Sequence, residues 1–137
     1  MATNPRRKAR VAALQALYEG DLSDHDPLTA LERLAADAEL TEAQRAFAEE
    51  LVRGVLARRE EADALISRAA PQWPVSQLSP VDRNILRLAI TEILMNNGAP
   101  IRAAINEAVE LAKSFGSDNS AKFVNGVLGS ISLSLAG

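Results

Sequence analysis

The sequence predicts an all-α protein. Apolar residues recur every three or four positions along most of the chain, as on the buried face of a helix. The alternation of apolar and polar residues that is typical of strands is absent, and helix start and stop signals divide the chain into segments. A chain of 137 residues fits one domain, in which we expect two helical halves at about residues 1–70 and 71–137.

Two cap signals define the first two helices. Asn4-Pro5 places a capping residue before a proline at the first helical position, which predicts a helix from Pro5 to about Leu22. Its apolar face consists of Val11, Leu14 and Tyr18. Asp26-Pro27 repeats the signal and predicts a second helix.

The third predicted helix is long. Thr41 and Gln44 have the spacing of a capping box, and the apolar residues that follow Phe47 keep helical spacing as far as Ala69. Pro71 then ends a helix of about 28 residues. That length indicates that the helix spans both halves, with residues 71–78 as the connector between them.

The remaining helices are marked by prolines and glycines. Ser79-Pro80 opens a fourth helix, which Asn97-Gly98 ends. Pro100 opens a fifth, for which Gly116 supplies a left-handed stop. Asn119 or Ser120 caps the last helix, whose inward face is predicted to be Val124, Leu128, Ile131 and Leu135. Gly126 and Gly129 on this helix are predicted to let another helix approach closely.

Charge is unevenly distributed along the chain. The net charge is −3, and residues 1–10 carry four basic side chains and no acid, which leaves −7 on the rest. A basic arm on an acidic body favours one localised anionic partner, although a solvated helix end would have the same composition. The chain has no cysteine, which fits a reducing cytoplasm. No apolar run suits a signal peptide or a membrane span.

Catalytic motifs are missing from the sequence. His25, the single histidine, lies between two aspartates, where a solvated loop is a better interpretation than a metal ligand. The sequence contains no glycine-rich phosphate loop and no cysteine nucleophile. We therefore expect a protein that is not an enzyme and that uses no cofactor or metal. Trp73, in the connector, is a candidate anchor for a partner, but a tryptophan at such a place more often fills the junction between the two halves, and we expect that role.

A polar turn after the fifth helix is a candidate RNA site. Phe115 and Phe123 flank this turn together with Lys113 and Lys122, and splayed bases of single-stranded RNA stack on such rings. Asn119 and Ser120 have the groups to bond base edges. The alternative is that both rings belong to the core and that Asn119 and Ser120 only cap the last helix.

Arginines of the first helix extend this candidate site. Arg6 and Arg10 share one side of the helix, whereas Arg7 points about 100° away. Their guanidinium groups are suited to bidentate contacts with phosphate.

Three blocks carry a family resemblance: RRKARVAALQALYEGDL, LSPVDRNILRLAITEIL and INEAVELAKSFGSDNSAKFVNGVLG. Over nearly its whole length the chain resembles the NusB family of bacterial transcription antitermination factors. The resemblance implies two packed helical bundles with about seven helices. It also implies a heterodimer with NusE, a small-subunit ribosomal protein, that binds the boxA element of ribosomal RNA leaders. In that family the bound complex helps RNA polymerase to resist termination.

The resemblance also assigns residues to partners. The residues that it places at or near RNA are Arg6, Arg7, Arg10, Gln15, Tyr18, Lys113, Phe115, Asn119, Lys122 and Phe123. It places Asp82 at NusE, with Arg83 and Arg87 nearby. Asn119 stands where many relatives have an acid, which should strengthen phosphate binding. Ser76 and Gln77 also replace acids of some relatives, so the contacts with NusE are expected to differ in detail.

Two other functions have different signatures. NusB-like modules also precede the catalytic domain of ribosomal RNA cytosine methyltransferases, but that role would require a methyl-donor-binding domain that this sequence lacks. The other alternative is a helical scaffold that binds only protein, including a homodimer formed through the arginine-bearing face. RNA affinity that falls steeply with salt would distinguish RNA binding from the scaffold role.

Overall fold

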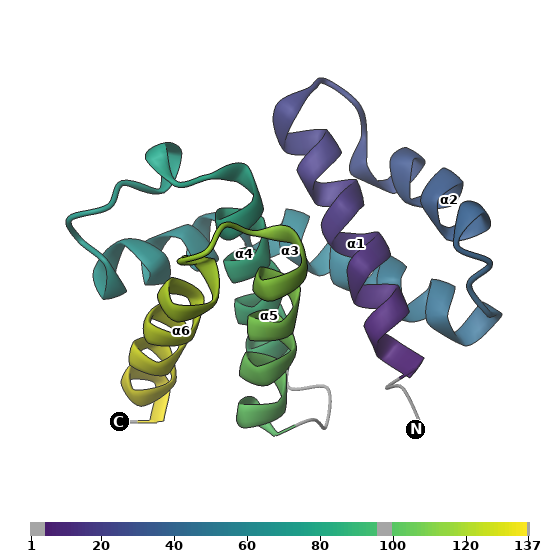
Figure 1. Ribbon diagram of the computed structural model, residues 1–137. Coiled ribbons are helices and arrows are strands. Elements are labelled where there is room, and N and C mark those ends of the chain that lie inside the picture. The colour runs from purple at the N-terminus through teal and green to yellow at the C-terminus, as the bar shows by residue number, and fades with distance from the viewer. Residues whose placement is uncertain (1–4, 96–99, 137) are drawn as a thin grey trace.

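The computed structural model describes residues 5–95 and 100–136. Within these residues the protein has six α-helices, one short 3-10 helix and no strand, which confirms the all-α prediction. The helices are α1 (Pro5–Leu22), α2 (Pro27–Asp37), α3 (Glu42–Ala69), η1 (Val75–Gln77), α4 (Pro80–Met95), α5 (Ile101–Phe115) and α6 (Ser120–Ala136) (Figure 1). The predicted cap at Asn4 and the predicted stop at Asn97-Gly98 lie outside the described residues.

The long helix α3 connects two groups of helices. It packs against α1 and α2, and also against α4 and α6, while α5 packs against both α4 and α6 (Figure 1). Helix α1 in turn packs on α4, so the two groups share one continuous core. None of the described helices is both long and apolar enough to cross a bilayer.

Helix α4 lies at the centre of the molecule. Nine consecutive residues, from Asn84 to Glu92, are buried, because α1, α3, α5 and α6 all pack against this helix. Ile85, Leu86 and Ile90 are fully buried. Burial of each such side chain contributes roughly 1.5–3 kcal/mol. Asn84, Arg87 and Glu92 in the same run find polar partners inside the protein, and these partners position the site described below. The buried hydroxyl of Thr91 has no hydrogen-bond partner within the described part of the chain.

Several local signals act as predicted. Asp26 caps α2 by accepting a hydrogen bond from the backbone N–H of Leu28 at 3.1 Å. At the start of α3, the Gln44 backbone N–H donates to the Thr41 hydroxyl at 3.1 Å, and the Thr41 N–H donates to the Gln44 side chain at 2.9 Å. These bonds form the predicted capping box, and α3 is 28 residues long, as its apolar spacing indicated.

Gly116 ends α5 in a different way from the prediction. Its φ of −92° and ψ of −171° are extended, not left-handed, and its N–H donates to the carbonyl of Ala112 at 2.9 Å. A Cβ atom at this position would lie 2.8 Å from that carbonyl oxygen and would collide with Ser120. Glycine is required here because the chain folds back closely on itself.

The predicted close approach at Gly126 and Gly129 was wrong. A Cβ atom at either position would meet nothing within 4 Å. The close helix crossing lies instead at Gly54 of α3, where a Cβ atom would be 2.8 Å from Thr91 and from Met95 of α4. Leu135 was also placed wrongly, because its side chain is 42% exposed, whereas Val124, Leu128 and Ile131 are buried as predicted.

Candidate nucleic-acid interface

The turn between α5 and α6 separates two surface hollows. The first, which we call the α1 hollow, has a volume of about 550 Å³ and lies beside the C-terminal half of α1. Its lining includes Gln15, Tyr18, Leu22, Val81 and Phe115. The structure thus brings together three of the predicted RNA-contact residues, from α1 and from the end of α5.

The second hollow, which we call the α6 hollow, lies between the end of α3, the connector and the start of α6. Its volume is about 430 Å³. Its lining includes Trp73, Asn119, Lys122, Phe123 and Gly126. Three more predicted RNA-contact residues therefore share one surface, and Trp73 lies among them.

The turn itself is held by serine side chains. The Ser117 backbone N–H donates to the Ser120 hydroxyl at 2.9 Å, and the two serine hydroxyls lie 3.2 Å apart. Ser120 is buried, whereas Asn119 is exposed and, among the described residues, accepts only through its backbone carbonyl, from Phe123 N–H. The amide group of Asn119 is thus available to a ligand.

The two rings and two lysines near the turn differ in accessibility. Phe115 is 39% exposed, whereas Phe123 is half-buried and packs against the core on one side. Lys113 is exposed, with its ammonium 3.5 Å from Glu110. Lys122 is also exposed, and no acidic side chain of the described part of the chain forms an ion pair with it.

Arg7 shares its charge with a carboxylate of α5. Its guanidinium donates two hydrogen bonds to Glu107, at 2.8 and 3.2 Å, and the side chain remains 43% exposed. These bonds lower the pKa of Glu107 below its ordinary value, because they outweigh the opposing effect of burial. The same bonds raise the pKa of Arg7.

Arg10 is not placed as its predicted role requires. Its side chain is only 5% exposed, and its guanidinium donates to the two carboxylate oxygens of Glu92 at 2.5 and 3.0 Å. A third nitrogen contact, at 3.5 Å, reaches Glu107. Because its donors are directed inward, Arg10 joins α1 to α4 and α5 and does not present a phosphate-binding fork. Arg6 is exposed, and its guanidinium lies 4.3 Å from the centre of the Phe47 ring.

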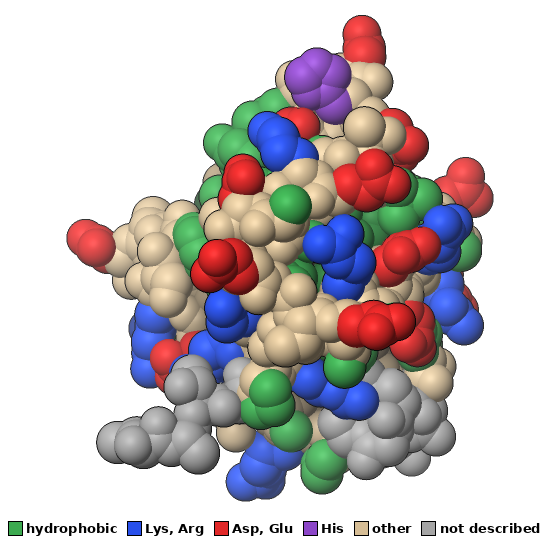
Figure 2. Space-filling model, turned by 90° about the vertical axis from the view of Figure 1, so that its right-hand side faces the viewer, with side chains coloured by type: hydrophobic (Ala, Val, Ile, Leu, Met, Phe, Trp, Pro, Cys, Tyr) green, Lys and Arg blue, Asp and Glu red, His purple; other side chains and the backbone are tan. Residues whose placement is uncertain are grey.

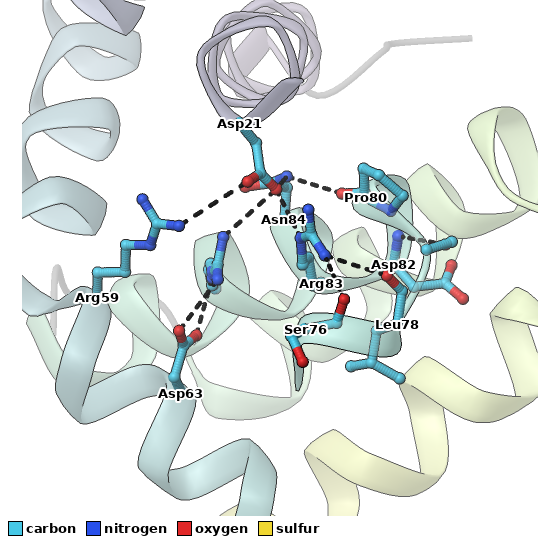
Figure 3. A network of polar contacts seen from close by, with 11 residues as sticks. Asp21, Arg59, Asp63, Ser76, Leu78, Pro80, Asp82, Arg83 and Asn84 are labelled. Carbon is cyan, nitrogen blue, oxygen red and sulfur yellow. Dashed lines mark hydrogen bonds and ion pairs between the residues drawn. The ribbon is translucent and has the colours of Figure 1, made fainter. Parts of the chain in front are cut away.

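Arg83 and Arg87, expected near the protein partner, also face inward. Arg83 donates to Asp21 at 2.6 Å (Figure 3). Arg87 is 4% exposed and donates to both oxygens of Asp63 at 2.8 and 3.0 Å. The buried amide of Asn84 adds a bond to Asp21 at 2.8 Å. These arginines therefore connect α1, α3 and α4 inside the protein.

Asp21 is the centre of this network. Burial raises the pKa of this carboxyl group, but the hydrogen bonds from Arg83 and Asn84 and the charges of Arg83 and Arg87 outweigh burial. The resulting pKa of Asp21 lies below its ordinary value. Its side chain is only 8% exposed, so the carboxylate depends on these partners and not on water.

Asp82 fits the predicted partner-facing role better. Its Oδ1 atom is buried and has no hydrogen-bond partner within the described part of the chain. Its neighbour Val81 lines the α1 hollow. A carboxylate oxygen without a donor is costly to keep buried. The residue as a whole is partly exposed in the first turn of α4, so part of it is accessible to a bound protein.

Other parts of the described surface have fewer features of a binding site. On the side of α2, basic and acidic side chains are interspersed and form no single-sign patch (Figure 2). His25 is exposed, with one ring nitrogen 3.4 Å from Glu19. No group of three or more metal-ligating side chains gathers within residues 5–95 and 100–136.

Sequence reasoning missed two features of this region. Glu92 lies seven residues after Ile85, on the buried face of α4, and an acid at that position signals a buried basic partner. Trp73 was expected to fill the junction between the halves, but it is 54% exposed. No signal in the sequence shows which surface its ring faces, because only the packing of the connector against α6 decides this.

A comparison with known families matches residues 7–132 to the NusB family. This chain belongs to the NusB family. The transcription antitermination protein NusB of Dehalococcoides mccartyi is 51% identical over 134 residues, which is 98% of this chain and 94% of that protein. The corresponding protein of Chloroflexus aggregans is 48% identical over 128 residues, 92% of this chain and 85% of that protein.

Solved structures of the NusB family have the same fold. A crystal form of NusB from T. maritima has a TM-score of 0.88 at 39% identity and covers 97% of this chain and 93% of its own. A crystal structure of the antitermination factors NusB and NusE in complex with dsRNA has a TM-score of 0.87 at 26% identity. That match covers 97% of this chain and 99% of the other.

Proposed function

We propose that this chain is a transcription antitermination factor that binds RNA as a heterodimer with NusE. The RNA element is boxA of ribosomal RNA leaders, and the bound complex joins RNA polymerase in the cytoplasm and makes transcription of ribosomal RNA operons processive. The protein acts by binding and assembly, not by catalysis. Family membership and the NusB–NusE–dsRNA complex of a protein with the same fold support this proposal.

The turn between the two hollows is the observation that carries the RNA-binding proposal. It presents an exposed ring, an available amide and an unpaired ammonium group from Phe115, Asn119 and Lys122. These groups match the base faces, base edges and phosphates of single-stranded RNA. Arg6 and Arg7 extend the surface along α1 towards its N-terminus, about 12–14 Å from Gln15 at the helical rise per residue.

The proposed contact with NusE begins at Asp82. Asp82 is partly exposed in the first turn of α4, and a carboxylate there suits a basic or hydrogen-bond-donating side chain of the partner. Arg83 and Arg87 stabilise this surface from inside the protein. Both form ion pairs with Asp21 and so hold the start of α4 against α1. Arg83 and Arg87 thus position the surface near NusE, and Asp82 makes the contact.

The length of the relatives favours this function over a methyltransferase module. The Dehalococcoides protein is described as an antitermination protein, and this chain matches 94% of its length. The protein-only scaffold and the homodimer are outcomes of the experiment below.

Binding of a boxA RNA and of a scrambled RNA, each with and without NusE, tests the proposal. At fixed salt we expect preference for boxA, and we expect NusE to increase that preference. Affinity should also fall linearly with salt on a logarithmic scale, because phosphate contacts release counterions. Equal and weak binding of both RNAs in all conditions would contradict the proposal and leave the scaffold role, and size-exclusion chromatography would then detect a homodimer.

Matched variants separate the two partners. Lys122→Glu should weaken RNA binding about tenfold and leave NusE binding intact, because it reverses one exposed phosphate contact. Arg53→Glu, an exposed charge reversal on α3, is the control and should have little effect on either partner. Asp82→Lys should abolish co-elution with NusE. Co-elution of that variant with NusE would contradict the assignment of Asp82.

A further inference from the structure

We propose that Trp73 is a stacking platform for one base of the bound RNA. This inference rests on the proposed RNA-binding function and adds a residue and a location to it. Trp73 belongs to the connector that joins α3 to α4, far in sequence from the turn after α5. The fold brings these two segments together, and residues of both line the α6 hollow.

The backbone at Trp73 is restricted by a tight turn. The Trp73 N–H donates to the carbonyl of Ala70 at 3.0 Å, directly after α3. Pro71 and Pro74 restrict the chain on both sides. Trp73 is 54% exposed, which is unfavourable for a large apolar side chain in water and leaves its ring accessible to a ligand.

The surroundings of Trp73 match the phosphate of a nucleotide and the edge and face of its base. Lys122, whose ammonium forms no ion pair within the described residues, provides a cation for a phosphate, and Asn119 provides an amide for a base edge. The half-buried ring of Phe123 adds a second apolar surface. Gly126 keeps one wall open, since a Cβ atom there would meet nothing within 4 Å.

The composition of the hollow favours a base over an apolar peptide. Leu14, Leu22, Leu34 and Val81 line the α1 hollow, and such a surface suits aliphatic side chains of a protein. The α6 hollow has few large aliphatic side chains and combines two aromatic rings with one cation and the two amides of Gln72 and Asn119. Aromatic rings beside a cation are typical of single-strand binding surfaces.

Trp73 fluorescence tests the inference directly, because this is the single tryptophan of the chain. Titration of the full chain with a boxA RNA should quench the emission of Trp73, since a stacked base quenches an indole. Anisotropy of the same RNA, labelled at one end, measures binding independently. The quenching and anisotropy curves should have the same midpoint.

Two substitutions and a control complete the test. Trp73→Ala should weaken RNA binding about tenfold, as loss of one stacked base predicts. Trp73→Phe should stay within about threefold of the parent affinity, because a phenyl ring still stacks on a base. Leu56→Ala removes an exposed apolar side chain of α3 that does not line the hollow, and should leave affinity unchanged. Circular dichroism would show that all three variants are folded.

The outcomes separate this inference from the proposed function. RNA binding by anisotropy, without quenching and with unchanged affinity of Trp73→Ala, would overturn the role of Trp73 and leave the antitermination proposal standing. Quenching by NusE in the absence of RNA would assign the hollow to protein and would also overturn it. No binding of RNA in any condition would overturn both proposals.

Discussion

At the scale of single residues, Arg10 shows how burial changes the role of a charged side chain. In the sequence it belongs to a basic cluster with Arg6 and Arg7. In the structure its guanidinium is enclosed by Glu92 of α4 and Glu107 of α5, while its two neighbours remain accessible to different degrees. A charge reversal at Arg10 would place three carboxylates together, so loss of RNA binding in such a variant would report loss of folding.

We expect Arg10→Ala to lower the free energy of unfolding by about 3–5 kcal/mol, because it removes a buried cation from beside two carboxylates. Urea unfolding followed by circular dichroism measures this change. Lys8→Ala, an exposed substitution on the same helix, should change stability by less than about 0.5 kcal/mol.

A double variant gives the complementary result for Arg10. Replacing the pair by apolar side chains, in Arg10→Met with Glu92→Leu, should recover part of the loss, since neither charge is then left buried. Equal stability of Arg10→Ala and the parent would contradict the buried ion pair.

At the scale of helices, the crossing of α3 and α4 depends on one glycine. Gly54 lies within α3, where alanine would normally be the better helix former by about 1 kcal/mol. Here an added methyl group would press on Thr91, which is fully buried, and on the sulfur of Met95. Met95 can change its rotamer, but Thr91 has a short side chain and is enclosed by its neighbours.

Gly54→Ala should therefore destabilise the protein by about 1–3 kcal/mol, as overpacking does in well-filled cores. Gly129→Ala is the matched control on α6, where an added Cβ atom meets nothing within 4 Å. It should stabilise the protein by up to about 1 kcal/mol through helix propensity. Thermal unfolding compares the melting temperatures of the two variants with that of the parent. A higher melting temperature in both variants would argue against the close crossing.

At the scale of the whole molecule, charged side chains join the N-terminal helices to the C-terminal group. Asp21 at the end of α1 bonds to Arg83 and Asn84 of α4, and Arg59 of α3 lies 3.8 Å away (Figure 3). Glu107 of α5 makes the corresponding bonds to Arg7 of α1. The relative placement of the two hollows depends on these connections, because the hollows are lined by different helices.

Stability should fall in acid because of these carboxylates. The folded-state pKa values of Asp21 and Glu107 lie below their ordinary values, so the unfolded chain binds protons first as the pH falls. The contribution of Asp21 and Glu107 to the free energy of unfolding is fully present above about pH 5 and begins to fall near their ordinary pKa of about 4. It is lost as the pH falls through their folded-state pKa values.

Asp21→Asn should cost about 3 kcal/mol at pH 7, and its difference from the parent should shrink below about pH 4. Asp24→Asn, an exposed substitution three residues away, should follow the pH profile of the parent. Unfolding free energies measured from pH 3 to pH 7 compare the three proteins. A difference that stays constant over this range would show that the charge of Asp21 does not contribute.

The order of the described helices and several of their boundaries were determined by the sequence itself. Pro27, Thr41 with Gln44, and Pro71 act on the backbone within one helical turn, so their effects require no knowledge of the rest of the chain. The apolar spacing likewise identified most of the buried face of α3 and α6. The sequence also contained the three blocks that indicated the family.

The tertiary structure alone decided which polar and aromatic residues face solvent. Arg6 and Arg10 have the same residue type and lie on the same side of α1, yet one is exposed and the other is buried against Glu92. Trp73 and Lys122 are 49 positions apart in the sequence and line one hollow. Local patterns specify the period of a helix, but the partner that covers each face comes from distant segments, and burial depends on that partner.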